Sequence, residues 1–152
     1  MYVFRLARAA YESLDGEGAR LYGGRWNSPG TPVVYTSSSR ALAALEYLAN
    51  VDVADVPDDL VLCTIEVPDD APAERLTAAS LPDDWTQVPP SSVSRERGDT
   101  WAGTRNALLL RVPAVLVPEE EHVLLNPAHD AMTRVRVVTR RAFAFDERLL
   151  KH

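Results

Sequence analysis

The sequence predicts an α+β fold with a strand-rich core and few short helices. Short runs of β-branched and large aliphatic residues alternate with segments that contain glycine or proline, which is the pattern of a sheet built from short strands. One stretch, residues 40–50, has the length and composition of a helix. The chain has 152 residues, of which 46% are hydrophobic, so we expect one domain, residues 1–152, that buries a real core.

The first half of the chain is expected to alternate strands with loops before the helix. Glycines at positions 16, 18, 23 and 24 break regular structure there. A serine before the helix supplies an N-cap, because its side chain accepts a hydrogen bond from the first turn. In order, we expect a strand at residues 3–6, a helical turn or loop at 7–14, mainly loop at 15–30, a strand at 32–37, a cap at Ser38 or Ser39, a helix at 40–50, and a strand at 60–67.

The second half is expected to be strands and loops. Residues 82–94 are rich in proline and serine and predict a long connection. The strands expected after it are residues 107–112 and 115–117, which Pro113 separates, then 122–125, and a final strand or hairpin arm at 134–145, where apolar and polar residues alternate.

The composition argues against a nucleic-acid-binding surface. The net charge is −6, and Lys151 is the only lysine. Phosphate contacts need clustered basic residues. The short acidic runs are read as solvated loop ends, and no Asp-x-Asp spacing supports a metal site, so we expect no metal.

The location expected from the sequence is cytoplasmic. Cys63, the single cysteine, excludes an internal disulfide framework and lies in an apolar run, as a buried, inert thiol does. No apolar stretch approaches the ~18 residues of a membrane span. The N-terminus lacks the basic-then-apolar layout of a signal peptide.

Glu46 is anomalous within the expected helix. Leu42, Leu45 and Ala49 are expected to form the apolar face, and Glu46 falls about 40° from Leu42 on a helical wheel. A buried carboxylate is costly unless it is paired or hydrogen-bonded. Glu46 therefore lies either at the edge of the apolar face or in the wall of a cleft.

A second anomaly is Gly-Gly-Arg-Trp-Asn at residues 23–27. Paired glycines allow the backbone to approach a ligand closely, and Arg25 offers a rigid fork for a phosphate or carboxylate. The same residues also suit a turn with a surface arginine and a core tryptophan. Neither a Walker motif nor Gly-x-Gly-x-x-Gly is present, so a nucleotide pocket here is of another kind.

These residues carry a family resemblance. Gly-Gly-Arg-Trp-Asn-Ser-Pro-Gly-Thr-Pro-Val-Val-Tyr-Thr-Ser at 23–37, followed by Ala-Leu-Ala-Ala-Leu-Glu at 41–46, resembles the signature of RES-domain proteins. Leu-Leu-Leu-Arg-Val-Pro at 108–113, Val-Pro at 117–118 and Leu-Leu-Asn-Pro-Ala-His at 124–129 resemble the second half of the same family. The resemblance extends from about Phe4 to Phe145.

The resemblance implies a toxin of a bacterial type II toxin–antitoxin pair, with a mixed-sheet core similar to that of ADP-ribosyltransferases. It implies NAD+ as substrate with no further cofactor, an Xre-like antitoxin that blocks the pocket, and a homo-oligomer. Arg25, Tyr35 and Glu46 are implied as catalytic positions. The residues implied to bind substrate are Arg5, Trp26, Asn27, Ser37, Asn126 and His129.

Two departures from the family pattern bear on activity. Ala114 stands where the family usually has serine, and Asp130 stands where proline often follows the histidine. His122 and His152 have no supporting context, and a structural or surface role is expected for both. Three readings follow: an NAD+ glycohydrolase or phosphorylase, a protein ADP-ribosyltransferase, and a binding module whose pocket has lost turnover.

Overall fold

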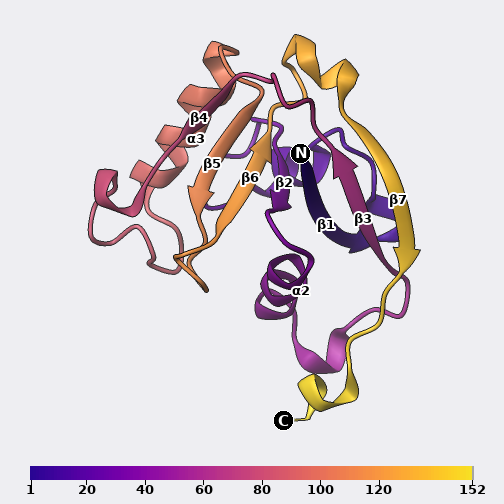
Figure 1. Ribbon diagram of the computed structural model, residues 1–152. Coiled ribbons are helices and arrows are strands. Elements are labelled where there is room, and N and C mark those ends of the chain that lie inside the picture. Colours follow the sequence, from indigo (N-terminus) through magenta and orange to yellow (C-terminus); the bar gives the residue numbers. More distant parts are fainter. Residues whose placement is uncertain (152) are drawn as a thin grey trace.

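The computed structural model describes residues 1–151 as one sheet with three α-helices and several short 3-10 turns (Figure 1). His152 lies outside the described residues. The strands are β1 (Tyr2–Arg8), β2 (Val34–Ser37), β3 (Leu60–Glu66), β4 (Ala73–Arg75), β5 (Leu109–Pro113), β6 (Glu121–Leu125) and β7 (Arg136–Ala142). The helices are α1 (Glu17–Tyr22), α2 (Arg40–Ala49) and α3 (Ser92–Thr104).

The seven strands have the order β4-β5-β6-β2-β1-β3-β7. The β4–β5 pair is parallel, and the other neighbours are antiparallel. The sheet is therefore mixed. The expected α+β fold, with a strand-rich mixed-sheet core and few short helices, is confirmed.

Strand pairing is weakest in the middle of the sheet, between β2 and β1. Only Phe4 and Ser37 pair there, whereas β1 and β3 pair along their whole length. The two halves of the sheet separate at this junction (Figure 1). One buried apolar cluster contains residues from both halves. That cluster joins Val3 and Ile65 from one half to Val123 and Leu125 from the other, and all four are fully buried. Burial of this apolar surface holds the halves together.

Figure 1 shows α3 beside β4 and β5, and α2 next to β1 and β2, where the two halves of the sheet separate. Trp101 and Ala102 of α3 pack in a cluster with Leu110 of β5 and Leu124 of β6. Ala43 of α2 belongs to a second cluster, which contains Phe4, Leu6 and Leu62 of β1 and β3. Each half of the sheet thus packs against one helix, as layered domains require, whereas β7 at the edge is exposed along its whole length.

Helix α2 begins as expected, but its buried face is rotated. Ser39 is the N-cap, because its hydroxyl accepts a hydrogen bond from the backbone N–H of Leu42 at 3.1 Å. The expected apolar face was wrong, since Leu45 and Ala49 are exposed. The helix packs through Leu42 and Ala43 instead. Contact with the β1–β3 half decides the face, which the wheel alone does not reveal.

Helix α3 is the largest correction, because residues 82–94 were expected to be a connection and no helix was expected after them. The helix is polar and buries mainly small residues, among them Ser94, Gly98 and Ala102. Such residues leave no apolar stripe for the helical period to reveal. A Cβ atom on Gly98 would lie 1.6 Å from the carbonyl oxygen of Trp26, so α3 rests directly on the glycine-rich segment.

Three smaller corrections concern local turns and edges. Residues 15–30, expected to be mainly loop, contain α1, and β4 was not expected. The strand expected at residues 115–117 was wrong. Hydrogen bonds from Ala114 N to Glu120 O and from Glu120 N to Val117 O close a turn there, which removes the segment from the sheet.

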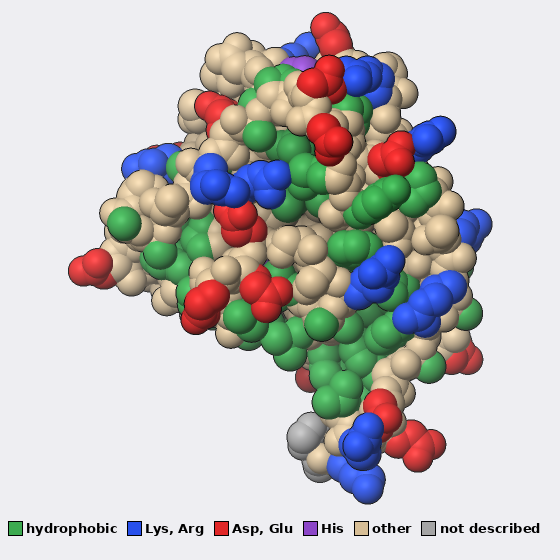
Figure 2. Space-filling model, viewed as in Figure 1, with side chains coloured by type: hydrophobic (Ala, Val, Ile, Leu, Met, Phe, Trp, Pro, Cys, Tyr) green, Lys and Arg blue, Asp and Glu red, His purple; other side chains and the backbone are tan. Residues whose placement is uncertain are grey.

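The surface has mixed charge. Figure 2 shows basic and acidic side chains interspersed over the visible face, with no large patch of one sign. Ion pairs such as Arg8–Asp59 and Arg136–Glu66 join them. Exposed pairs contribute at most about 1 kcal/mol each, so they are secondary to the apolar core. Among the described helices, none has the length and apolar character needed to cross a membrane.

Candidate active site

A cleft of about 620 Å³ opens beside the β1–β2 junction. Its walls come from β1, β2, β6, α2, the glycine-rich segment after α1, and the loop that contains Val88 and Pro90. Six of the nine residues predicted for the site line this cleft: Arg5, Arg25, Trp26, Tyr35, Ser37 and Glu46. The weak junction therefore forms the hollow in which segments distant in the sequence meet.

Tyr35 anchors the glycine-rich segment to β2. Its hydroxyl donates to Oδ1 of Asn27 at 2.7 Å and accepts from the backbone N–H of Trp26 at 3.1 Å. A Cβ atom on Gly24 would lie 2.7 Å from that hydroxyl oxygen, so the approach requires glycine. Burial raises the pKa of Tyr35 far above its ordinary value, and the phenol stays protonated. Because the hydroxyl is engaged, Tyr35 offers its ring to a ligand.

Arg25 ties the glycine-rich segment to the opposite wall. Its Nη1 donates to the carbonyl oxygens of Trp85 at 2.8 Å and Gln87 at 2.9 Å. Among residues 1–151, no hydrogen bond occupies its Nε or Nη2. Burial lowers the pKa of Arg25, and the nearby Glu46 opposes that shift. An arginine remains charged under such shifts, so two donor groups of a cation are left for an anionic ligand.

Glu46 lies in the cleft wall, so the second of its two sequence-based placements is the observed one. Its Oε2 lies 3.2 Å from Nε2 of His122, and its Oε1 accepts from Nδ2 of Asn50 at 3.2 Å. The hydrogen bond from His122 holds the pKa of Glu46 below its ordinary value, with smaller help from Asn50 and Arg25 and against the effect of burial. The carboxylate is therefore anionic at neutral pH.

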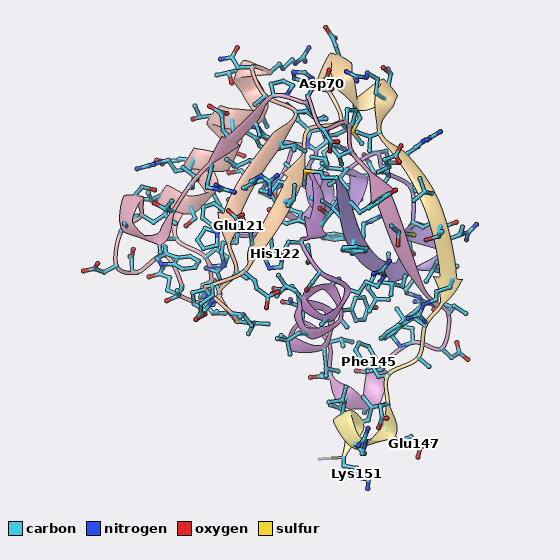
Figure 3. All side chains as sticks on the ribbon, viewed as in Figure 1. Asp70, Glu121, His122, Phe145, Glu147 and Lys151 are labelled. Carbon is cyan, nitrogen blue, oxygen red and sulfur yellow. The ribbon has the colours of Figure 1, made fainter. Side chains whose placement is uncertain are left out.

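His122 is the site residue that the sequence did not reveal. It was expected to be structural or on the surface, yet it lines the cleft, and its Nδ1 lies 3.0 Å from Oγ of Ser37. Figure 3 shows His122 between β6 and α2. His122 pairs with Ser37 across the β2–β6 ladder. Only the strand order brings the two together, and no local pattern around His122 indicates it.

Arg5 and Trp26 line the cleft, but their main contacts stabilise its walls. The guanidinium of Arg5 donates to the carbonyl oxygens of Ser13 and Tyr11 at 3.1 and 2.9 Å. Trp26 is 2% exposed and packs against Trp85, with ring centroids 6.4 Å apart. Of the two readings of the glycine-rich segment, the core tryptophan is thus observed, whereas Arg25 faces the cleft.

Asn27, Asn126 and His129 are not brought to the cleft. The amide of Asn27 donates to the carbonyl oxygens of Ala19 and Thr31 and so closes the loop around it. Asn126 is buried and donates to the carbonyl oxygen of Ala102 at 2.9 Å. His129 caps a 3-10 turn through Nδ1. Asn27 and His129 thus fix local backbone turns, and Asn126 joins the segment after β6 to α3.

Ala114 also lies outside the cleft lining, although its neighbours Pro113 and Val115 contribute to it. Ala114 is completely buried. The residues on either side of position 114 therefore form part of the cleft wall, whereas Ala114 itself is closed off from solvent. A serine hydroxyl there would meet protein rather than a ligand in the cleft.

The cleft combines an anion, a cation and flat apolar surface. Glu46 and Arg25 supply the charges, and the ring of Tyr35, with Tyr22 and Val88 at the rim, supplies the surface. Within residues 1–151, no three His, Cys, Asp or Glu side chains gather as a metal site would require. These groups suit a ligand that carries a planar ring, a cationic centre and anionic groups.

Comparisons with known proteins identify relatives of this chain. The RES domain family model matches residues 2–146. The chain is 40% identical to the Prs ADP-ribosylating toxin of Sphingobium sp. (strain YBL2), covering 92% of this chain and 88% of that protein. It is 38% identical to Toxin Res of Photorhabdus laumondii subsp. laumondii, covering 99% and 98%.

A solved structure shares the fold. The structure, described as the M. tuberculosis MbcT-MbcA toxin-antitoxin complex, superposes with a TM-score of 0.75 at 21% identity, covering 93% of this chain and 83% of that one. At this identity the likeness concerns the fold alone. The family match over nearly the whole chain and the two close relatives establish that the chain belongs to the RES-domain family.

Proposed function

We propose that this RES-domain chain is the toxin of a toxin–antitoxin pair and that it cleaves the nicotinamide–ribose bond of NAD+. The observation that carries the proposal is the Glu46 carboxylate, which is kept anionic and aimed into a cleft that also holds the charged fork of Arg25. The names of the relatives, Toxin Res and Prs ADP-ribosylating toxin, support both parts of the proposal.

The chemistry needs the charges that the cleft supplies. When the bond between the ribose C1 and the nicotinamide nitrogen breaks, both electrons leave with the nicotinamide, which becomes neutral. Positive charge develops on the ribose, as in glycoside hydrolysis, and an anion close to it lowers the barrier. Attack by water then yields ADP-ribose and releases one proton, whereas attack by phosphate yields ADP-ribose 1-phosphate. The neutral leaving group needs no proton donor.

Five of the residues that line the cleft have roles in this reaction. Glu46 stabilises the developing positive charge or holds a ribose hydroxyl. Arg25 grips the pyrophosphate through Nε and Nη2, because Nη1 is already bound to the loop. The ring of Tyr35 stacks on the nicotinamide, since its hydroxyl is committed to Asn27 and Trp26. Arg5 and Ser37 maintain the walls that receive the substrate.

A second candidate is transfer of ADP-ribose to a protein. The 40% identical relative named Prs ADP-ribosylating toxin favours it. The same bond breaks, and a nucleophilic side chain of the target attacks in place of water. A third candidate is a binding module without turnover, which rests on Ala114, a buried residue whose neighbours Pro113 and Val115 line the cleft.

Partners follow from the same proposal. An Xre-like antitoxin would block the cleft, where Tyr22 and Val88 present large exposed apolar surfaces at the rim. A homo-oligomer and a cytoplasmic location belong to the proposal as well. The neighbour described as a toxin-antitoxin complex supports the antitoxin in particular.

Labelled NAD+ tests the proposal. Purified protein is incubated with NAD+ labelled in the adenylate and in the nicotinamide, with and without phosphate and a bacterial lysate. Free nicotinamide with soluble ADP-ribose supports hydrolysis, and ADP-ribose 1-phosphate supports phosphorolysis. Label on a protein supports transfer, and intact NAD+ under all conditions refutes the proposal.

A further inference from the structure

We propose that His122 is a positioning residue that, together with Asn50, clamps the Glu46 carboxylate in the orientation that bond cleavage requires. The inference rests on the function proposed above, because it names the residues that orient Glu46 in that reaction. Sequence reasoning gave neither His122 nor Asn50 a role in the site. Both line the cleft, and each holds a different oxygen of the same carboxylate.

The hydrogen-bonded chain runs from the interior to the cleft. Ser37 is 4% exposed, the His122 side chain 13% and the Glu46 side chain 39%. The Ser37 Oγ lies 3.0 Å from Nδ1 of His122, and Nε2 of His122 lies 3.2 Å from Oε2 of Glu46. Exposure increases along the chain, so Glu46 meets the ligand while His122 stands behind it.

The hydrogen bonds among Ser37, His122 and Glu46 indicate which ring nitrogen of the histidine carries the proton. A carboxylate only accepts hydrogen bonds, so Nε2 of His122 carries a proton and donates it to Glu46. In the neutral ring, Nδ1 is then an acceptor, and the Ser37 hydroxyl donates to it. By donating to Nδ1, Ser37 favours the Nε2–H tautomer, which can donate to Glu46. A base or stabilising group that is oriented by a further residue is a recurring arrangement in active sites.

The backbone holds His122 at a fixed distance from α2. His122 pairs with Ser37 on one side and with Val112 on the other, so it lies in the interior of the sheet. The start of β6 is also joined to the segment that leads into α2. Ser38 N donates to Glu121 O at 3.1 Å, and the Ser39 hydroxyl donates to Glu120 Oε1 at 3.2 Å. The imidazole therefore has a rigid base from which to orient Glu46.

Asn50 supplies the second grip. It is the C-cap residue of α2, and its Nδ2 donates both to the backbone oxygen of Glu46 at 2.8 Å and to Oε1 at 3.2 Å. Donors on both oxygens stop the carboxylate from rotating. Each oxygen keeps a further lone pair for a substrate hydroxyl or for the positive charge on the ribose. Small displacements of such groups are costly in rate, because the reacting atoms must be aligned.

Kinetic measurements distinguish two roles for His122: positioning Glu46 for catalysis, or only linking β6 to α2. His122→Leu removes the donor, His122→Gln keeps an N–H donor, and Asn50→Ala removes the second grip at an exposed position. We expect His122→Leu to lower kcat for NAD+ cleavage roughly tenfold to a hundredfold with little change in KM, because misplacing a reacting group costs up to about a hundredfold in rate. His122→Gln should recover most of the rate, and Asn50→Ala should lower kcat to a smaller extent.

A spectroscopic readout needs no substrate. Long-range ¹⁵N–¹H spectra of the imidazole rings, recorded at neutral pH, should show His122 in the Nε2–H form, and Ser37→Ala should weaken that preference. The opposite tautomer overturns the hydrogen-bonded chain. A lower Tm with unchanged kcat in His122→Leu, or no recovery with His122→Gln, overturns the positioning role.

The two proposals fail in different ways. If the wild-type protein leaves NAD+ intact, both the proposed function and the catalytic role of the clamp are refuted. The ring spectrum then decides only whether the hydrogen bonds from Ser37 through His122 to Glu46 are present. If the wild type cleaves NAD+ and His122→Leu cleaves it equally fast, the clamp alone is refuted.

Discussion

A Cβ atom on Gly98 would lie 1.6 Å from the carbonyl oxygen of Trp26, so the backbone of α3 rests directly on the glycine-rich segment. The same segment carries Arg25 into the cleft and is held from the other side by Tyr35. The position of Arg25 thus depends on a helix that begins far away in the sequence. Contacts of this kind cannot relax when a side chain is added, because both partners are backbone.

Gly98→Ala should destabilise the protein strongly, since the helix must move away from Trp26. We expect a loss of at least about 3 kcal/mol in the free energy of unfolding, at the upper end of overpacking effects. Urea denaturation measures it. Gly103→Ala is the matched control in the same helix, because a methyl group added there would meet no neighbouring group within 4 Å. That control should gain about 0.5–1 kcal/mol from helix propensity, and equal losses in both variants would contradict the account.

Tyr35→Phe should destabilise the site without removing the ring. The substitution leaves Oδ1 of Asn27 and the N–H of Trp26 without their hydroxyl partner. We expect a loss of about 1–3 kcal/mol, the cost of unpaired buried polar groups. Thermal unfolding measures it against Tyr2→Phe, whose ring is largely exposed. An unchanged Tm would show that the hydroxyl does not anchor the segment.

The stabilising contribution of Glu46 should depend on pH in a defined direction. Its pKa is depressed in the folded protein, chiefly by the hydrogen bond from His122. A depressed carboxyl pKa contributes stability above the unfolded value of about 4.3 and loses it as the pH falls through the folded value. The difference in Tm between wild type and Glu46→Gln should therefore be present at neutral pH and shrink below about pH 4.

Glu74→Gln is the control for that measurement, because Glu74 is exposed on the short edge strand β4. Its effect on Tm should be small throughout the pH range. A Glu46 effect that grows as the pH falls would mean that the carboxyl pKa is raised, which contradicts the clamp.

Ala114→Ser should not increase activity. Ala114 is fully buried and outside the cleft lining, so a new hydroxyl would lack access to the ligand. A buried hydroxyl without a partner costs about 1–3 kcal/mol, and we expect a lower Tm with an unchanged rate of NAD+ loss. A large gain in rate would show that position 114 reaches the substrate.

The sequence predicted the parts of the fold that have local signals. The Ser39 cap, the α2 helix and the β3 strand each follow from the residues within them. Helix α3 could not be recognised in the same way, because it buries Ser94 and Gly98 where a typical helix buries large apolar residues. Its packing is set by its close approach to Trp26, which only the folded structure reveals.

The site residues also divide into those that the sequence indicated and those that only the folded structure reveals. The family resemblance led to Arg25, Tyr35 and Glu46, and all three line the cleft. His122 was missed because its partner Ser37 lies opposite it only through the β2–β6 pairing, and strand order is not encoded locally. Asn126 and His129 belong to a recognisable motif, yet neither lines the cleft: Asn126 binds the backbone of α3, and His129 caps a 3-10 turn.

The most direct test of the central claim is the initial rate of NAD+ loss for the wild type, Glu46→Gln and Glu74→Gln, with thermal unfolding as a check on folding. Glu46→Gln keeps the size of the side chain and removes the anion. We predict NAD+ cleavage by the wild type, an equal rate for Glu74→Gln, and a loss of roughly a hundredfold or more for a folded Glu46→Gln protein, since charge stabilisation is a large term in catalysis. Cleavage by Glu46→Gln at the wild-type rate would contradict this prediction.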